Sequence, residues 1–470
     1  MPSTVKLPAT KRIEGHGRVS LYLGDDGLVN GAHFDVTEFR GFETMLEGRM
    51  VWEMPLITSR ICGVCPVSHH LAAVKAVDAL LGVDIPPAAR MLREILHLGG
   101  FAQDHALHFF FLAGPDFLLG DGTAARDLLG VVAADPELAK RAIALRRAGQ
   151  RVVEIVGGRT SHPVTAIPGG MSRGITEEDR AELQALTAEI LAGAIPSAEL
   201  ARESTERLLA QHPEFSAEPV SYLAQMRGSV FDLYDGEVRV MGPNGEISQE
   251  WPVTAYASHI AEESLPHSYA NAPYLTALGP DAGAYRVGPL ARLNIADTMP
   301  GPRSQELLNA YRATLGRPVH AVLAYHWTRM IELVATAERL DVLLADDEVI
   351  SPDVRVKVDR ADGVGIAAVE APRGTLIHHY EADPVGKVTK ANLIVATTHN
   401  IRSLDTSVLD AVVGSSYDGA LPDDVFRRME LGIRAHDPCL SCATHEIGRM
   451  PLVVEVVSAQ GVVLERRGVS

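Results

Sequence analysis

The sequence lacks an excess of positive charge, a long hydrophobic run and an export signal. Its 43 lysine and arginine residues face 60 aspartate and glutamate residues, and the formal charge of -17 argues against nucleic acid or an anionic membrane as a partner. No apolar run approaches the roughly 20 residues that a membrane-spanning helix needs. Residues 1–17 contain neither an apolar signal core nor a twin arginine. We therefore expect a cytoplasmic protein with no membrane span.

Cysteine is also scarce, with four residues in 470. All four lie in two Cys-x-x-Cys pairs near opposite ends of the chain, Cys62 with Cys65 and Cys439 with Cys442. This spacing lets two sulfurs converge on one ion, so two pairs make a four-thiolate set for zinc, nickel or iron. Unpaired thiols of this kind also fit a reducing cytoplasm.

The spacing alone leaves three interpretations open. A structural zinc site is the usual meaning of paired Cys-x-x-Cys, although its pairs normally lie only tens of residues apart. A redox-active metal is the second interpretation. Dithiol chemistry is the third, and it would leave one of the two pairs unexplained.

The rest of the chain predicts a mainly α fold with small β elements (α+β). Hydrophobic residues make up 46% of the sequence and the mean hydropathy is near zero, as in a globular protein with a core. Apolar periodicity predicts a hairpin at 18–39, helices over 66–156, 174–210 and 303–346, short strands at 228–257, a strand pair at 364–380 and 386–397, and two β runs at 451–466. Thr176 is the expected N-cap of the second helical stretch. Because the two cysteine pairs must meet, we expect the ends of the chain to converge.

The residues around the cysteines carry a resemblance to a known family. The first pair lies in Arg-x-Cys-Gly-x-Cys-x-x-x-His (60–69) and the second in Asp-Pro-Cys-x-x-Cys-x-x-His (437–445). Further blocks occur in the same order, at 12–16 (RIEGH), 38–43 (EFRGFE), 167–170 (IPGG), 369–374 (VEAPRG) and 391–393 (ANL). Together, from about residue 8 to 445, they resemble the large catalytic subunit of nickel–iron hydrogenases. The related complex I subunit shares the fold but lacks the four thiolates.

The resemblance implies reversible heterolytic cleavage of dihydrogen at a nickel–iron centre. Cys62 and Cys439 would be terminal ligands of nickel, and Cys65 and Cys442 would bridge nickel to an iron that carries cyanide and carbon monoxide. Four equivalent thiolates on one zinc would leave no open position for a substrate.

The same resemblance assigns roles around the metals. Glu14 would relay protons beside Cys439, and Arg373 would hold its guanidinium over the centre. Ala396 and Thr397 would line the cyanide pocket, although membrane-bound members of the family often have proline at the position of Ala396. His69 follows Cys65 by one helical turn and would hydrogen-bond a bridging sulfur.

A hard cation and several buried histidines complete the expected site. Glu43, His445 and the carbonyl of Leu393 would bind Mg²⁺ with waters. Further histidines are candidates for buried networks or proton routes, without an individual role for any of them: His70, His105, His108 and His162.

The resemblance also implies processing and partners. Residues 1–445 would form a single domain, and a dedicated protease would remove 446–470 after a chaperone has supplied nickel. With no further cysteine for an iron–sulfur cluster, the chain needs an iron–sulfur small subunit. With no Gly-x-Gly-x-x-Gly fingerprint, the chain is not expected to bind NAD itself.

The choice of electron acceptor stays open between branches of the family. The variants Pro-Val-Ser-His-His and Ser-Cys-Ala-Thr-His are similar to the cytoplasmic bidirectional branch, in which flavin and NAD subunits would complete the electron route. The alternatives are a hydrogenase coupled to heterodisulfide reductase or another acceptor, and a non-catalytic zinc-binding relative.

Overall fold

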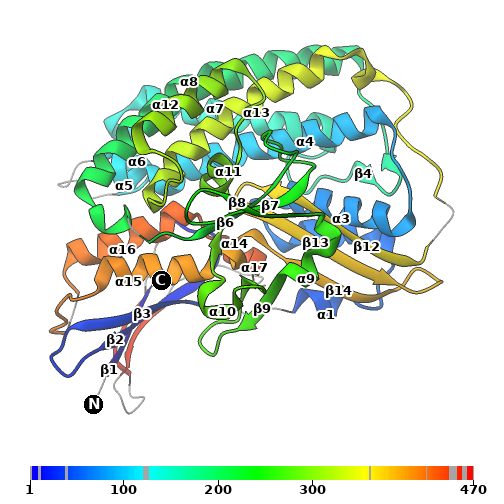
Figure 1. Cartoon of the computed structure of the whole chain (residues 1–470). Helices are drawn as coiled ribbons and strands as arrows, with labels where there is room; N and C mark the ends of the chain where they lie inside the picture. The colour runs from blue at the N-terminus through cyan, green and yellow to red at the C-terminus, as the bar shows by residue number, and fades with distance from the viewer. Residues whose placement is uncertain are drawn as a thin grey trace.

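A layer of long helices covers two groups of β strands (Figure 1). The computed structural model describes residues 3–8, 12–37, 41–119, 126–216, 218–358, 361–419, 421–443, 453–457 and 463–468. The long helices are α3 (Pro66–Leu81), α4 (Pro87–Ala106), α7 (Pro136–Gly157), α8 (Glu177–Gln211), α12 (Pro302–Leu315) and α13 (Tyr325–Ala345). The expected α+β class is confirmed.

Packing between the long helices explains the apolar faces of their sequences. Helix α4 packs along α7, and α8 packs along α13 and α7. Nearly every residue of α3 is buried, which is the pattern of a helix enclosed on all sides rather than one with a solvent face. The expected N-cap is confirmed, because the Thr176 hydroxyl accepts a hydrogen bond from the Asp179 N–H at the start of α8.

Shorter helices connect these elements and carry the site. Those before α8 are α1 (Phe42–Leu46), η1 (Val51–Glu53), α2 (Met54–Thr58), η2 (Ser59–Ile61), the π-helical η3 (Leu107–Ala113), α5 (Gly114–Leu118) and α6 (Leu128–Ala134). Between α8 and α13 lie η4 (Pro213–Ser216), η5 (Val253–Ala255), α9 (Tyr256–His259), α10 (Gly279–Ala282), α11 (Pro289–Ile295) and η6 (Val322–Ala324). After α13 come η7 (Asp347–Ile350), α14 (Ala396–His399), α15 (Ile401–Val412), α16 (Asp423–His436) and α17 (Leu440–Ala443).

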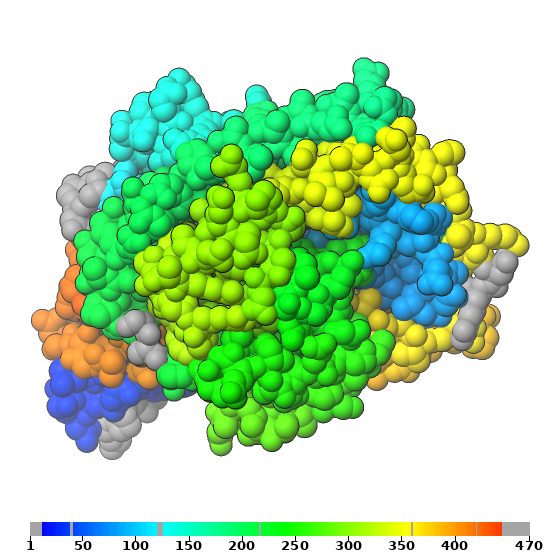
Figure 2. Space-filling model, turned by 45° about the horizontal axis from the view of Figure 1, so that its top comes forward, coloured from blue at the N-terminus to red at the C-terminus, as the bar shows by residue number. Residues whose placement is uncertain are grey.

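One sheet joins the two ends of the chain. Its strand order is β16-β15-β1-β2-β3. The strands are β1 (Ser3–Pro8), β2 (Gly17–Leu23), β3 (Val29–Val36), β15 (Val453–Val457) and β16 (Val463–Gly468). The blue N-terminal strands and the orange helices α15 and α16 lie side by side in two views (Figures 1 and 2). The expected hairpin, the two C-terminal β runs and the convergence of the ends are confirmed.

A three-stranded sheet lies against α3 and corrects one prediction. It consists of β12 (Gly363–Ala371), β13 (Gly374–Ala382) and β14 (Val388–Ile394), paired in that order. The sequence suggested two strands, but Pro372 and Arg373 form a turn that divides the first apolar run. The second run also ends early, because helix α14 begins at Ala396.

The remaining strands are short and form three further small sheets. They are β4 (Ala166–Ile167), β5 (Gly170–Met171), β6 (Ser221–Met226), β7 (Glu237–Met241), β8 (Ile247–Trp251), β9 (Ile260–Ser264), β10 (Asn271–Leu275) and β11 (Tyr285–Arg286). Apolar side chains of β6–β8 and of β12–β14 share a small core that includes Leu223, Trp251 and Ile377. Among the described residues, none of the helices is both long and apolar enough to cross a bilayer.

Candidate metal centre

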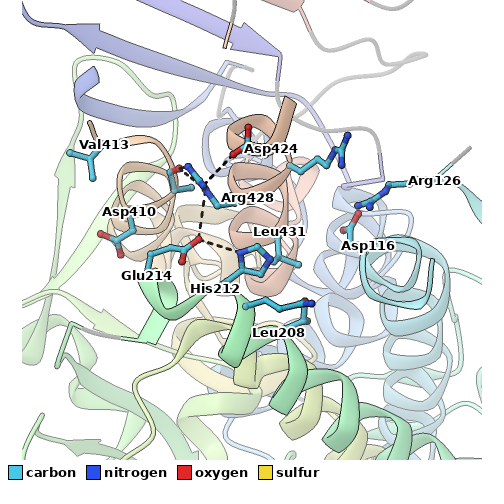
Figure 3. A pocket seen from close by; sticks show the side chains of 13 residues that line it. Asp116, Arg126, Leu208, His212, Glu214, Asp410, Val413, Asp424, Arg428 and Leu431 are labelled. Carbon is cyan, nitrogen blue, oxygen red and sulfur yellow. Dashed lines mark hydrogen bonds and ion pairs between the residues drawn. The ribbon is translucent and has the colours of Figure 1, made fainter. Parts of the chain in front are cut away.

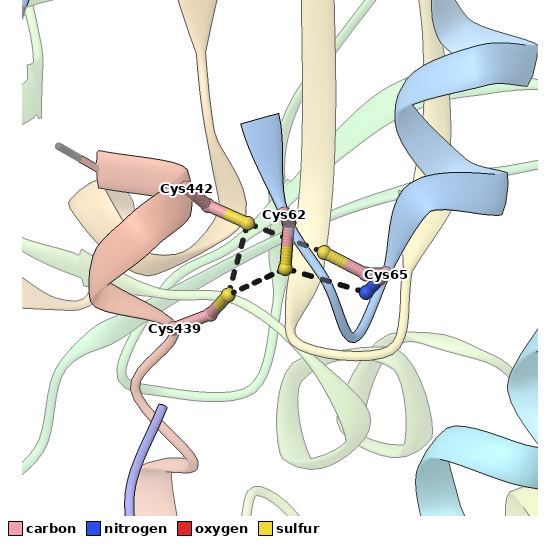
Figure 4. A group of neighbouring side chains, drawn as sticks. All are labelled: Cys62, Cys65, Cys439 and Cys442. Atoms are coloured by element: carbon pink, nitrogen blue, oxygen red, sulfur yellow. Dashed lines mark hydrogen bonds between the residues drawn. The ribbon is translucent and has the colours of Figure 1, made fainter. Parts of the chain in front are cut away.

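Four thiols from the two ends of the chain meet at one point (Figure 4). Cys62 follows η2 and Cys65 caps the start of α3, while Cys439 precedes α17 and Cys442 lies within it. The Sγ atoms of Cys62 and Cys439 lie 3.2 Å apart, as do those of Cys65 and Cys442, and 2.9 Å separates Cys439 from Cys442. All four sulfurs lie within 4.8 Å of one another.

The thiols are buried and form no disulfide. Cys62 and Cys439 are each 1% exposed and Cys65 is 7% exposed, while Cys442 is partly buried. Burial alone would raise the pKa of the Cys62 thiol, but hydrogen bonds with the other three thiols and the charge of Arg373 lower it well below its usual value. Burial instead raises the pKa of the Cys439 and Cys442 thiols. The cluster offers four soft sulfur donors, which is a suitable donor set for nickel or zinc.

A carboxyl group contacts this cluster directly. Oε2 of Glu14 accepts hydrogen bonds from Cys439 Sγ at 3.1 Å and from the Ser441 N–H at 3.0 Å. Burial, followed by the negative charge of Cys62, raises the pKa of the Glu14 carboxyl. Glu14 thus lies beside Cys439, where the sequence placed it.

Gly15 explains why Glu14 can approach so closely. The Leu440 N–H donates to the carbonyl of Glu14 at 2.8 Å, which binds the N-terminal segment to the start of α17. At Gly15, φ is +88° and an added Cβ would lie 2.4 Å from Leu440 Cβ. Only glycine fits this backbone conformation and this separation.

Arg373 is held by two carboxylates that the sequence analysis did not single out. Its Nη1 donates to Asp104 Oδ2 at 3.0 Å, its Nη2 to Asp437 Oδ1 at 3.1 Å and its Nε to the Asp437 carbonyl at 2.9 Å. All three side chains are at most 3% exposed. Asp437 belongs to the Asp-Pro-Cys block, which was a signal in the sequence, whereas Asp104 lies on α4 with another acid, Glu94, and had no motif to mark it.

The other residues expected around the metals lie close to the thiols. The Thr397 hydroxyl accepts a hydrogen bond from the Cys439 N–H at 2.9 Å, and the adjacent Ala396 is buried. His69 lies in the first turn of α3, and its Nδ1 is 3.3 Å from His378 Nε2. Burial lowers the pKa of His69 to about 4, so its ring is neutral. Among the described residues, His69 Nε2 has no hydrogen-bond partner.

The residues expected to bind a hard cation are only partly described. Glu43 lies in α1, which packs against β14, the strand that carries Leu393. Glu43 also acts electrostatically on Tyr380 of the neighbouring strand β13. His445 lies outside the residues that the structure describes.

Three of the four remaining histidines belong to buried contacts. His70 Nδ1 lies 2.8 Å from the Pro55 carbonyl, His105 Nε2 lies 2.9 Å from Glu332 Oε2, and His108 Nε2 lies 2.7 Å from the Arg434 carbonyl. His162 is only partly buried and contacts the Ser59 carbonyl.

A surface cavity of about 540 Å³ lies apart from the cysteines (Figure 3). Arg428 in this cavity pairs with Asp424 and Glu214, and His212 pairs with Glu214 as well. These charges satisfy one another, so the cavity does not compete with the thiol cluster as the reactive site.

Comparison with known proteins gives one consistent answer. Residues 40–141 and 243–445 match the nickel-dependent hydrogenase family, and residues 8–39 match a HoxL-like family. The chain is 41% identical over 467 residues to a polypeptide of the vhc F420-non-reducing hydrogenase of Methanococcus voltae, covering 97% of this chain and 98% of the relative. It is 37% identical over 489 residues to the beta chain of the NAD-reducing hydrogenase HoxS of Cupriavidus necator, covering 99% and 100%.

Solved structures agree with the sequence relatives. The crystal structure of an NAD⁺-reducing [NiFe]-hydrogenase in the H₂-reduced state superposes with a TM-score of 0.89 at 37% identity, over 94% of this chain and 99% of that chain. A Ni-Fe-Se hydrogenase of D. vulgaris Hildenborough shares the fold, with a TM-score of 0.76 at 24% identity, over 95% and 100%. With these matches and a four-thiolate centre that fits nickel and iron, the chain belongs to the nickel-dependent hydrogenase large-subunit family.

Proposed function

We propose that this chain is the catalytic subunit that splits dihydrogen reversibly into protons and electrons at a nickel–iron centre held by its four cysteines. The observation that carries the proposal is the meeting of four buried Sγ atoms within 4.8 Å of one another, with the Glu14 carboxyl hydrogen-bonded to one of them. When bound, such a centre supplies the Lewis acidity and redox capacity that heterolytic cleavage of dihydrogen needs.

The thiols divide into two pairs in this proposal. Cys62 and Cys439 would hold nickel, and Cys65 and Cys442 would be shared between nickel and an iron that carries cyanide and carbon monoxide. The burial of the thiols excludes bulk water, which strengthens every electrostatic interaction at the site.

Glu14 carries the proton away from the centre. Its Oε2 lies 3.1 Å from Cys439 Sγ, which is within the distance for direct proton transfer between the thiol and the carboxylate. Because the carboxyl is poorly hydrated, its protonated form is not strongly disfavoured, and it can accept and release a proton in each turnover.

Arg373, Thr397 and His69 organise the pocket. Arg373 keeps a fixed positive charge near the thiolates, because Asp104 and Asp437 hold it on two sides. The Thr397 hydroxyl accepts a hydrogen bond from the Cys439 N–H and retains its own proton, which it could donate to a cyanide ligand of the iron. His69 Nε2 is a buried nitrogen that suits a hydrogen bond to a bridging sulfur.

Glu43 and the Leu393 carbonyl supply oxygen ligands for Mg²⁺, and His445 completes that site in the proposal. The packing of α1 against β14 supports the first two assignments. Oxygen donors with several waters are the environment that Mg²⁺ prefers.

Maturation would remove residues 446–470 and leave residues 1–445 as one domain. Strand β15 of this tail pairs with β1, with Val5 opposite Val456, so the tail is anchored at the N-terminal sheet. A protease would act after a chaperone has delivered nickel.

Electrons leave through another polypeptide. The chain has no cysteine beyond the four of the centre, so an iron–sulfur small subunit must conduct the electrons. The relatives from Cupriavidus necator and among the solved structures are NAD-reducing enzymes, which supports flavin and NAD subunits as the further route in the cytoplasm. The relative from Methanococcus voltae is named for not reducing F420, so the alternative of another acceptor, such as heterodisulfide reductase, stays part of the proposal.

Metal analysis of the purified, processed complex tests the proposal. We expect one nickel and one iron for each copy of this chain beyond the iron of the small subunit, together with hydrogen-dependent dye reduction. One zinc and no nickel after growth with ample nickel would instead support the zinc-binding alternative. NAD reduction by the same preparation, compared with reduction of artificial dyes, decides between the two acceptors.

A further inference from the structure

A second group of metal-type ligands lies at the edge of the N-terminal sheet. His33 on β3, His267 in the loop between β9 and β10, and Asp405 on α15 come from three distant parts of the chain. Their ligand atoms lie within 4.8 Å of one another. None of them belongs to the four-cysteine centre or to a block of the family pattern described above.

Each of the two imidazole rings has one nitrogen that makes no hydrogen bond within the part of the chain that the structure describes. Nδ1 of His33 and Nε2 of His267 are buried atoms that have no hydrogen-bond partner among the described residues. Nδ1 of His33 lies 3.7 Å from Asp405 Oδ2, which is beyond hydrogen-bond distance. Asp405 is held in place because its Oδ1 accepts a hydrogen bond from the Phe34 N–H at 2.6 Å.

The local charge favours a cation. Asp35 follows His33 on the same face of β3 and is fully buried, and its Oδ1 lacks a hydrogen-bond partner among the described residues. Its Oδ2 accepts hydrogen bonds from Arg18 Nε at 3.0 Å and Ser20 Oγ at 2.5 Å. The negative charges of Asp35 and Asp405 both favour positive charge at the two imidazoles, and Arg18 offsets part of this at Asp35.

We infer that His33, His267 and Asp405 form a binding site for a zinc-type divalent cation, separate from the four-cysteine centre. Two imidazoles and one carboxylate make the three-ligand set of sites that leave a coordination position open. Ligand atoms of a tetrahedral zinc site lie about 3.3 Å apart, given zinc–nitrogen bonds of roughly 2.0–2.1 Å. The observed separations therefore require only a small inward movement.

The two imidazole rings can face one ion only after a rotation, and the fourth coordination position of that ion would be open to water. The two rings are stacked, with centroids 4.2 Å apart and planes inclined by 18°, so at least one ring must turn for both lone pairs to face one ion. Both side chains are only partly buried. His33 and Asp405 also line a cavity of about 530 Å³, from which a water can reach the ion.

Zinc binding by the assembled, nickel-loaded complex tests this inference, because its four cysteines are then already occupied. We expect the wild-type complex to take up one more tight equivalent of Zn²⁺ than the His267→Ala and Asp405→Asn complexes, in competition with a coloured chelator. Loss of a direct ligand should weaken binding by more than the roughly 10–100-fold that loss of a supporting residue costs. Co²⁺ in the same site should absorb without the sulfur charge-transfer bands of a thiolate site.

A matched control separates this site from other surface histidines. His212 is also beside a single carboxylate, Glu214, at 3.3 Å, so His212→Ala should leave the number of zinc equivalents unchanged. Hydrogen oxidation should stay at the wild-type level in all three variants, and unchanged thermal midpoints would show that they fold. Equal zinc uptake by the wild type and the His267→Ala and Asp405→Asn variants would overturn the inference, whatever the fate of the hydrogenase proposal.

Discussion

The four-cysteine centre and the group of His33, His267 and Asp405 (the histidine cluster) both gather ligands from distant parts of the chain. They differ in how far they are exposed to solvent. Cys62 and Cys439 are separated by 377 positions and are each 1% exposed, and a carboxyl and a guanidinium are fixed beside them. His33 has a side chain that is 39% exposed, and the cluster opens to a cavity. A buried site can support a reaction that bulk water would disturb, whereas a site open to solvent suits the binding and release of an ion.

Removal of one cysteine thiol should cause the largest loss of activity and of bound nickel. Cys439→Ala leaves three thiolates and removes the sulfur that contacts Glu14, so we expect no measurable hydrogen oxidation and less than one nickel per chain. Elemental analysis and dye reduction measure both. Val64→Ala, in the loop between the first two cysteines, is the control and should retain metal and activity. Full activity of Cys439→Ala would place the chemistry elsewhere.

Loss of the proposed proton acceptor, Glu14, should cause the next largest loss of activity. Glu14→Gln keeps the size of the side chain and a hydrogen bond to the Ser441 N–H but cannot accept a proton. Activity and hydrogen–deuterium exchange should fall by about 10²–10⁴-fold with nickel and iron retained. Glu47→Gln, at an exposed glutamate, should change neither. A variant that retains normal exchange would show that protons take another route.

Removing one carboxylate that holds Arg373 should cause an intermediate loss of stability and activity. Asp104→Asn removes one of the two negative charges that hold the buried guanidinium, and hydrogen bonds to charged groups contribute about 1.5–3 kcal/mol to stability. Activity should fall by less than the roughly 10²–10³-fold cost of removing an electrostatic group, because Arg373 itself remains. Thermal unfolding and steady-state rates measure the two effects.

An exposed ion pair provides the contrast for that stability effect. Glu189→Gln breaks the pair of Glu189 with Arg147, whose side chains are 37% and 71% exposed. Such a pair contributes about 0–1 kcal/mol. If Asp104→Asn were no more destabilising than Glu189→Gln, burial would not be what makes the Arg373 network strong.

The smallest effect should be a pH dependence at the histidine cluster. Asp405 raises the pKa of His33 in the folded protein, so the stabilising pair is fully formed below the unfolded pKa of about 6.5 and is lost as pH rises through the folded value. In a His267→Ala background without added metal, His33→Ala should lower the thermal midpoint slightly at pH 6 and less at pH 8. A difference that grows with pH would contradict the sign of this coupling.

Local patterns predicted much of the fold because they depend on near neighbours. The hairpin around residue 25, the N-cap at Thr176 and the buried helix after Cys65 all follow from periodicity and capping within a few residues. The division of β12 from β13 was missed because Pro372 and Arg373 turn to meet Arg292 and Asp437, which lie far away in the sequence. The start of α14 at Ala396 was missed for a similar reason, since Thr397 is placed by its contact with Cys439.

The sequence by itself determined the thiol donors, the family and the residues expected beside the metals, because short motifs fix which side chains stand one helical turn or one loop apart. Only the tertiary structure decided how those motifs meet. It brought Glu14 to Cys439, enclosed Arg373 between Asp104 and Asp437, and gathered the histidine cluster, for which no motif exists. Contacts between residues hundreds of positions apart depend on how helices and sheets pack, and packing is a property of the whole chain.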